Sequence, residues 1–206
     1  MKSLPTQDRA LRKRSALLTA AKAEFSDSGF ETATAKSIAA RAGVATGTFY
    51  QYFENKNDIL CVLAADRFSQ LHDNIDIFKP GAIDPADATS ADAVMSLFSE
   101  VLLFVYNFHE QDPELHQVLE QRRSVDPELS AILAEGEAVL QERVLRFVQS
   151  FNLPQAELVA QNLFAMAEGL VHRHVFAHSP SATSFDKHQV VSVGAAMLAA
   201  YFQSPN

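Results

Sequence analysis

The segment from Thr34 to Lys56, TAKSIAARAGVATGTFYQYFENK, constrains the fold more than any other part of this chain. The Thr34 hydroxyl can cap the free amides of a helix that begins at Ala35 or Lys36. This helix is predicted to end at Gly43, because glycine adopts the left-handed backbone conformation that stops one helix and turns the chain into the next. The segment therefore predicts two short helices joined by a tight turn.

The second of these helices has an apolar side and a polar side. Phe49 and Phe53 lie four residues apart and are predicted to face the core. The other faces carry hydroxyl, amide and phenol groups, from Thr46, Thr48, Tyr50, Gln51 and Tyr52. Gly47 would let the helix N-terminus approach a phosphate closely, and Lys56 could reach the adjacent DNA backbone. The pattern indicates a helix-turn-helix that binds DNA.

These residues resemble the DNA-binding signature of the TetR family of regulators. The resemblance rests on three short runs, which are Ile38-Ala39 with Ala42-Gly43-Val44, Gly47-Thr48-Phe49-Tyr50, and Tyr52-Phe53 with Lys56. The family's first helix and its exit turn are matched by Leu17, Ala20, Ala21 and Phe25 followed by Gly29-Phe30. The specific match covers roughly the first quarter of the chain.

One departure from the family pattern is Ala45, where many members carry a serine that caps the recognition helix. Without that hydroxyl, the cap must come from water or from neighbouring backbone. The resemblance and the residue chemistry together assign the DNA contacts to Thr34, Lys36, Ala45, Thr46, Gly47, Thr48, Tyr50, Gln51, Tyr52 and Lys56.

Charge is distributed unevenly along the chain. Residues 1–56 carry nine basic and five acidic side chains, a net charge of +4, whereas the rest of the chain carries eight basic and twenty acidic ones, a net charge of −12. The basic end can approach phosphate while the acidic bulk is held away from it. One basic run could reach phosphates or a minor groove, or could equally be a solvated tail: Arg9, Arg12, Lys13 and Arg14.

Composition and periodicity predict an all-α fold. With 206 residues and 48% hydrophobic content the chain can bury a real core. We expect a three-helix helix-turn-helix DNA-binding domain at residues 1–56 and a larger helical effector-binding and dimerisation domain at residues 57–206. Caps and proline positions predict the later helices, at about residues 55–78, 91–110, 114–124, 127–151, 155–178 and 185–203. A loop is expected around Pro80-Gly81 and Pro85.

Several classes of protein are not indicated. The sequence shows no basic-apolar-small leader and no uninterrupted apolar run of membrane-spanning length, so we expect a cytoplasmic protein with no membrane partner. No phosphate-cradling glycine loop, nucleophile elbow or zinc-protease spacing occurs, so we expect no catalytic residues and no cofactor. Cys61 is the only cysteine and is predicted to be a core residue, because it lies in an apolar stretch.

The last helix is apolar nearly all round. Val193, Gly194, Met197 and Ala200 illustrate a composition with scarcely any polar face. In proteins that resemble the TetR family, the last two long helices of each subunit form a four-helix dimer interface, and this composition fits that role. Burial inside a monomer is the alternative. A two-fold dimer would present two recognition helices to successive major-groove half-sites, and a palindromic double-stranded operator follows.

The resemblance also implies that the larger domain binds a small ligand, whose entry shifts the helix starting near Lys56 and changes the spacing of the recognition helices. The predicted lining residues are Phe98, Leu102, Tyr106, Phe164, Glu168 and His172. For each of them, a role in the core or the dimer interface is the alternative. The many phenylalanines favour an apolar or aromatic effector.

Three histidines invite a metal hypothesis. His172, His174 and His178 lie near one predicted helix end, and Glu168 lies one turn before His172. No further cysteine or carboxylate completes a familiar spacing with them. His109, Glu110 and His116, around Asp112-Pro113, are predicted to be solvated residues at a loop edge, so we expect no metal site.

Three functions therefore remain open. The leading hypothesis is a ligand-responsive repressor that binds its operator as a homodimer. The second is a DNA-binding regulator without a small-molecule effector, either controlled by a partner protein or constitutive, and the third is a helical enzyme or interaction module.

Overall fold

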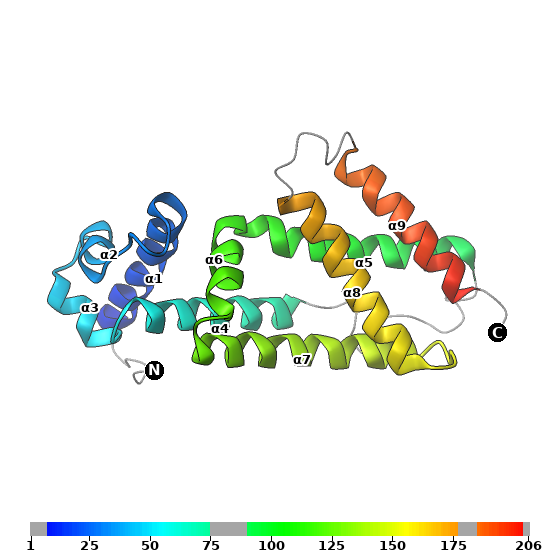
Figure 1. Ribbon diagram of the computed structural model, residues 1–206, viewed down its shortest axis with the longest axis horizontal. Helices are drawn as coiled ribbons and strands as arrows, with labels where there is room; N and C mark the ends of the chain where they lie inside the picture. The colour runs from blue at the N-terminus through cyan, green and yellow to red at the C-terminus, as the bar shows by residue number, and fades with distance from the viewer. Residues whose placement is uncertain (1–7, 75–89, 177–184, 204–206) are drawn as a thin grey trace. The chain divides into compact units, whose positions relative to one another are not determined.

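The computed structural model describes residues 8–74, 90–176 and 185–203, and within these residues the chain is all α-helical, as the sequence predicts (Figure 1). The helices are α1 (Asp8–Ser28), α2 (Ala35–Arg41), α3 (Thr46–Tyr52), α4 (Lys56–Asn74), α5 (Ala91–Gln111), α6 (Pro113–Arg123), α7 (Pro127–Gln149), α8 (Ala156–Phe176) and α9 (Lys187–Phe202). The predicted loop around residues 80–85, the loop at residues 179–184 and His178 lie outside the described residues.

The chain divides into two compact units, each built from two stretches of sequence. The first unit comprises Met1–Gln70 and Glu114–Gly136, and the second comprises Leu71–Pro113 and Glu137–Asn206. This division by packing does not coincide with the functional boundary proposed at residue 56. The difference arises because most of α4, all but the first residue of α6 and the first part of α7 share the core of the DNA-binding helices.

The core of the first unit is built on spacings visible in the sequence. On α1, the buried positions Leu17, Ala20, Ala21 and Phe25 form one helical face. α1 ends at Gly29, whose φ of +77° is the left-handed conformation that stops a helix. The α1 face packs in one cluster with α2, α3 and the start of α4, and with Leu115, Leu119 and Leu129 from later in the chain.

Helix boundaries follow the predicted caps. Asn55 Oδ1 accepts hydrogen bonds from the backbone amides of Asn57 at 2.8 Å and Asp58 at 3.0 Å, at the start of α4. Asp126 Oδ1 accepts from the amide of Leu129 at 3.1 Å, directly before α7. These bonds satisfy helix N-terminal amides that have no partner inside the helix.

Cys61 is a core residue of the first unit, as predicted. Its side chain is 1% exposed. Burial, followed by the negative charges of Asp126, Glu128 and Asp58, raises the pKa of Cys61 to about 12. The thiol is therefore neutral at ordinary pH, which makes it a poor nucleophile.

The second unit is organised around α5. Both α8 and α9 pack against this helix (Figure 1). Phe98, Leu102 and Tyr106 form its fully buried face. Gly194 brings α9 close, because a Cβ at that position would lie 3.0 Å from the Leu102 side chain. Gly194 thus serves packing within the chain.

α5 is also the one described helix that is long and apolar enough to cross a membrane, by length and composition alone. The core helix of a soluble protein passes the same test. α5 packs against α8 and α9 within the second unit.

Gly136 is required where α7 meets α4. A Cβ built at Gly136 would overlap the Phe68 ring, well inside van der Waals contact. We therefore expect Gly136→Ala to lower the free energy of unfolding by about 1–3 kcal/mol through overpacking. Gly47→Ala is the matched control, since a Cβ there meets nothing within 4 Å. Urea denaturation of both variants measures the difference, and equal stabilities would contradict the assignment.

Candidate functional site

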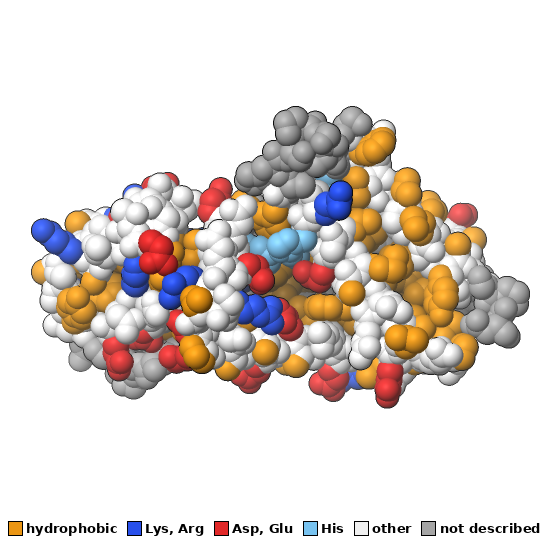
Figure 2. Space-filling model, in the orientation of Figure 1, with side chains coloured by type: hydrophobic (Ala, Val, Ile, Leu, Met, Phe, Trp, Pro, Cys, Tyr) orange, Lys and Arg blue, Asp and Glu red, His pale blue; other side chains and the backbone are white. Residues whose placement is uncertain are grey.

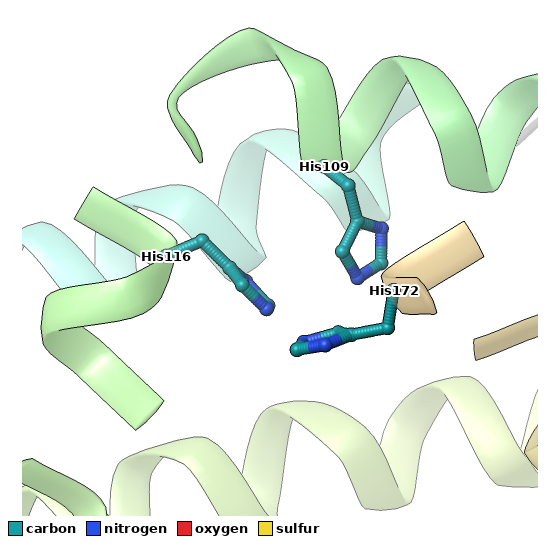
Figure 3. A group of neighbouring side chains, drawn as sticks. All are labelled: His109, His116 and His172. Carbon is teal, nitrogen blue, oxygen red and sulfur yellow. The ribbon is translucent and has the colours of Figure 1, made fainter. Parts of the chain in front are cut away.

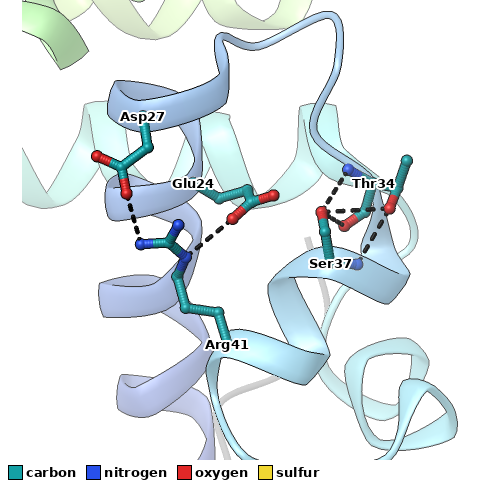
Figure 4. Close-up of polar contacts among 5 residues, drawn as sticks. All are labelled: Glu24, Asp27, Thr34, Ser37 and Arg41. Carbon is teal, nitrogen blue, oxygen red and sulfur yellow. Dashed lines mark hydrogen bonds and ion pairs between the residues drawn. The ribbon is translucent and has the colours of Figure 1, made fainter.

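The first helix of the DNA-binding pair is fixed by a reciprocal cap. Thr34 Oγ1 accepts a hydrogen bond from the Ser37 amide at 3.0 Å, and Ser37 Oγ accepts one from the Thr34 amide at 3.0 Å (Figure 4). This capping box begins α2 at Ala35, as predicted from Thr34. Thr34 thus has a clear structural task in addition to the DNA contact proposed for it.

The turn between α2 and α3 has the predicted geometry. Gly43 has φ +69°, in the left-handed region. Val44 is partly buried against the core of the first unit. Ala45 is the N-cap of α3 and makes no side-chain cap bond, as its missing hydroxyl implies.

α3 is held by two aromatic side chains. Phe49 is 0% exposed and Phe53 is 1% exposed, and their ring centroids lie 5.7 Å apart. Their burial turns Tyr50, which is 52% exposed, toward solvent. Among the proposed DNA contacts, Thr34, Lys36, Ala45, Gly47, Tyr50 and Gln51 are exposed, and Thr46, Thr48, Tyr52 and Lys56 are partly buried. The structure thus brings the proposed set together around the helix-turn-helix.

Arg41 ties α2 to α1. Its guanidinium lies 2.8 Å from Glu24 Oε2 and 2.7 Å from Asp27 Oδ2 (Figure 4). The hydrogen bond to Asp27 is the largest of the effects that raise the pKa of Arg41. From the sequence, Arg41 was predicted only to contribute one positive charge to residues 1–56. Its partners lie on another helix, so the spacing along the chain gave no signal for this pair.

Lys56 is also engaged within the first unit. Its ammonium donates to the carbonyl oxygens of Phe30 at 2.8 Å and Glu31 at 2.9 Å. It also lies 4.6 Å from the centroid of the Phe30 ring, and the Arg122 guanidinium lies 4.9 Å from the same centroid. The turn after α1 is therefore stabilised by two cations on one aromatic ring.

The second unit contains a small apolar hollow between its helices. α5 contributes Val101, Phe104, Val105 and Phe108, and the other lining residues are Leu71, Leu140, Val144, Leu163, Phe164, Ala167 and Glu168. Its volume of about 40 Å³ has room for a few water molecules only. A larger ligand would enter only if these side chains moved.

The chain is similar to known proteins in the sequence of its N-terminal part and in its fold. Residues 17–61 match the model of the bacterial regulatory proteins of the tetR family. Residues 17–61 therefore carry the DNA-binding helix-turn-helix of the TetR family of bacterial transcriptional regulators. No match was found among curated protein sequences.

Solved structures share the fold over nearly the whole chain. A TetR-family regulator from Mesorhizobium loti aligns with a TM-score of 0.72 at 18% identity, over 95% of this chain and 97% of that one. The fatty acid degradation regulator FadR from Bacillus halodurans aligns at 0.65 and 22% identity, over 97% of each chain. A complex of SmeT with triclosan aligns at 0.65 and 18% identity, over 90% of each chain. SmeT is the repressor of a multidrug efflux pump of Stenotrophomonas maltophilia.

The hollow uses a different face of α5 from the one predicted to bind ligand. Phe164 and Glu168 line it, whereas Phe98, Leu102 and Tyr106 lie fully buried in the core instead. Burial, followed by the Glu110 carboxylate, raises the pKa of Tyr106 to about 12, so its hydroxyl stays neutral. His172 is partly exposed and is not among the lining residues.

An apolar surface extends over α8 and α9 (Figure 2). Its exposed large side chains are Leu158 and Met166 on α8, and Val193, Met197 and Tyr201 on α9. On α9, Val193, Met197 and Tyr201 are exposed. The buried residues of this helix include Gly194, Ala195, Leu198, Ala199 and Phe202. Exposed apolar area of this kind is typical of interaction surfaces.

Substitutions of Lys36 and Lys56 are expected to differ in their effect on the stability of the fold. We expect Lys36→Ala to lower the slope of log affinity against log salt by about 0.9 for each phosphate that the protein no longer neutralises, with thermal stability unchanged. We expect Lys56→Ala to lower the melting temperature as well, because two hydrogen bonds and the ring contact disappear. Fluorescence anisotropy across a salt series and thermal denaturation measure both. An unchanged melting temperature for Lys56→Ala would contradict its structural role.

Proposed function

We propose that this regulator is a repressor that binds a palindromic operator as a homodimer and is released by a small apolar or aromatic effector. The observation that carries the proposal is a DNA-binding helix pair joined to a second unit with its own apolar hollow. A protein that only bound DNA would not need a second unit with its own hydrophobic core.

In this proposal the DNA contacts come from the exposed side of the helix-turn-helix. Thr46, Thr48 and Gln51 read bases, while Tyr50 and Lys36 hold the phosphate backbone. Changes at the base-reading positions should alter sequence preference, and changes at the phosphate positions should weaken binding to all sequences alike.

The effector proposal rests on the lining of the hollow. Its residues are apolar or aromatic apart from Glu168, so a ligand with an apolar body and one polar group suits it. The small free volume means that binding must open the hollow, and effector affinity then includes that cost. The complex of SmeT with triclosan shows a related fold bound to an aromatic compound.

The coupling proposal follows from α4. Its first residues belong to the first unit, and its residue Leu71 lines the hollow in the second unit. Leu140 and Val144 of α7 line it too, while the same helix begins in the first unit. A ligand that displaces Leu71 would shift α4. This helix begins at Lys56, directly after the helix-turn-helix in the sequence.

The alternative is a regulator without a small-molecule effector. The specific observation in its favour is the nearly filled hollow. A regulator of this kind would be constitutive or controlled by a partner protein, and it would bind its operator equally well with any compound present.

The proposal is tested on the DNA upstream of the protein's own gene. We expect a palindromic footprint, an affinity that falls steeply with salt, and release by at least one apolar aromatic compound from a panel. A footprint without release by any compound would favour the alternative. Binding no stronger than to random DNA, both there and in a genome-wide selection for bound fragments, would overturn both.

The dimer surface is tested by a charge on α9. Met197 is 63% exposed in the middle of the apolar surface, so Met197→Glu should convert the dimer to a monomer and weaken operator binding at least tenfold. Val125→Glu is the matched control, because Val125 is 60% exposed on the first unit. Light scattering measures the mass of each variant. If the Met197→Glu variant remained a dimer, this result would contradict the assignment of the dimer surface.

A further inference from the structure

We propose that His109, Glu168 and His172 form a binding site for one divalent transition-metal ion of the zinc type. His109 lies fully buried on α5, and the other two lie one turn apart on α8. His109 Nε2 lies 3.3 Å from Glu168 Oε2, and the ring centroids of the two histidines are 5.5 Å apart. Figure 3 shows the His109 ring on α5 and the His172 ring on α8.

The backbone fixes the tautomer of a neutral His109. Its Nδ1 lies 2.8 Å from the carbonyl oxygen of Val105. A carbonyl oxygen can only accept, so Nδ1 carries a proton and donates, and in the neutral ring Nε2 presents its lone pair. An imidazole whose other N–H donates to a backbone carbonyl is the usual arrangement of a metal-binding histidine.

The lone pair on Nε2 faces a carboxylate oxygen of Glu168. Two electron-rich atoms at 3.3 Å repel unless a metal ion, or the proton of a charged imidazole, lies between them. Zinc bonds to nitrogen and oxygen of about 2.0–2.2 Å at a tetrahedral angle place two ligand atoms about 3.4 Å apart. The observed separation of His109 and Glu168 thus matches one edge of a tetrahedral site.

His172 supplies the third ligand. Ring nitrogens of His109 and His172 lie within 4.8 Å of each other. The His172 side chain is partly exposed, so it can turn and shorten this distance. Phe176 packs on both rings, with centroids 4.7 Å from His172 and 6.1 Å from His109. This apolar wall lowers the local dielectric constant and strengthens binding of a cation to the carboxylate.

The ligand set and the access route both fit a metal ion. Two imidazoles and one carboxylate are a combination that proteins use for zinc, with the fourth position left to water. Glu168 is 36% exposed and lines the apolar hollow, so an ion can reach the site. The expectation of no metal considered the histidines of α8 separately from those near Asp112-Pro113, and it placed His109 at a solvated loop edge. The His109 side chain is instead fully buried.

The competing explanation is a proton in place of the metal. A protonated His109 would donate to both Val105 and Glu168 and would form an ion pair, with no affinity for zinc. Zinc binding therefore separates the two explanations.

The experiment titrates Zn²⁺ into the full chain, with no histidine tag, in competition with a fluorescent zinc chelator. We expect one ion per chain, and affinity weakened about 10- to 100-fold or more in Glu168→Gln and in His172→Gln. His188→Gln, which changes an exposed histidine of α9, is the matched control and should bind as the parent does. Circular dichroism confirms that each variant is folded.

Two results would overturn the proposal: no zinc binding by the parent chain, or parent-like affinity in both Glu168→Gln and His172→Gln. Both substituted side chains are partly exposed, so these variants are expected to fold even if His109→Gln does not. The readout is metal binding itself, so it does not depend on whether the proposed operator and effector are correct.

Discussion

The DNA-binding end depends on the burial of one side of a helix that is too short to be stable alone. α3 has seven residues, and isolated helices shorter than about 12 residues are marginal in water. Phe49 and Phe53 supply the missing stability by packing into the core with Ile38 and Phe25. The same burial fixes the rotation of α3, so the exposure of Tyr50 is a consequence of the hydrophobic core.

The cations at this end serve the fold before they can serve DNA. Arg41 pairs with Glu24 and Asp27, and Lys56 donates to two backbone carbonyls. The net charge of the first 56 residues therefore overstates the charge presented to a phosphate. Exposed side chains such as Lys36 carry more of that task. Both cations still contribute to the fold, because Arg41 ties α2 to α1 and Lys56 ties the start of α4 to the turn after α1.

In the second unit, α5 supports three features on different faces of one helix. Phe98 and Leu102 are buried against α8 and α9, Phe104 and Phe108 line the hollow, and His109 faces Glu168. A helix that is apolar nearly all round gives no periodicity from which to assign these faces. α5 carries apolar side chains on more than one face, so the sequence did not show which face meets the hollow. Phe98, Leu102 and Tyr106 lie in the core, whereas Phe164 and Glu168 of α8 line the hollow as predicted.

The sequence by itself determined the helices, their caps and the helix-turn-helix, because these depend on interactions within a few residues. Thr34 and Asn55 cap helices that begin directly after them, and Gly43 adopts the left-handed conformation in the turn after α2. Each of these roles depends only on neighbouring residues. Only the tertiary structure decided which side chains meet from distant segments, including Arg41 with Asp27, Lys56 with the carbonyls after α1, and His109 with Glu168. Their geometry depends on how helices rotate and cross, which is set by the packing of whole apolar faces and is not encoded in any short stretch of sequence.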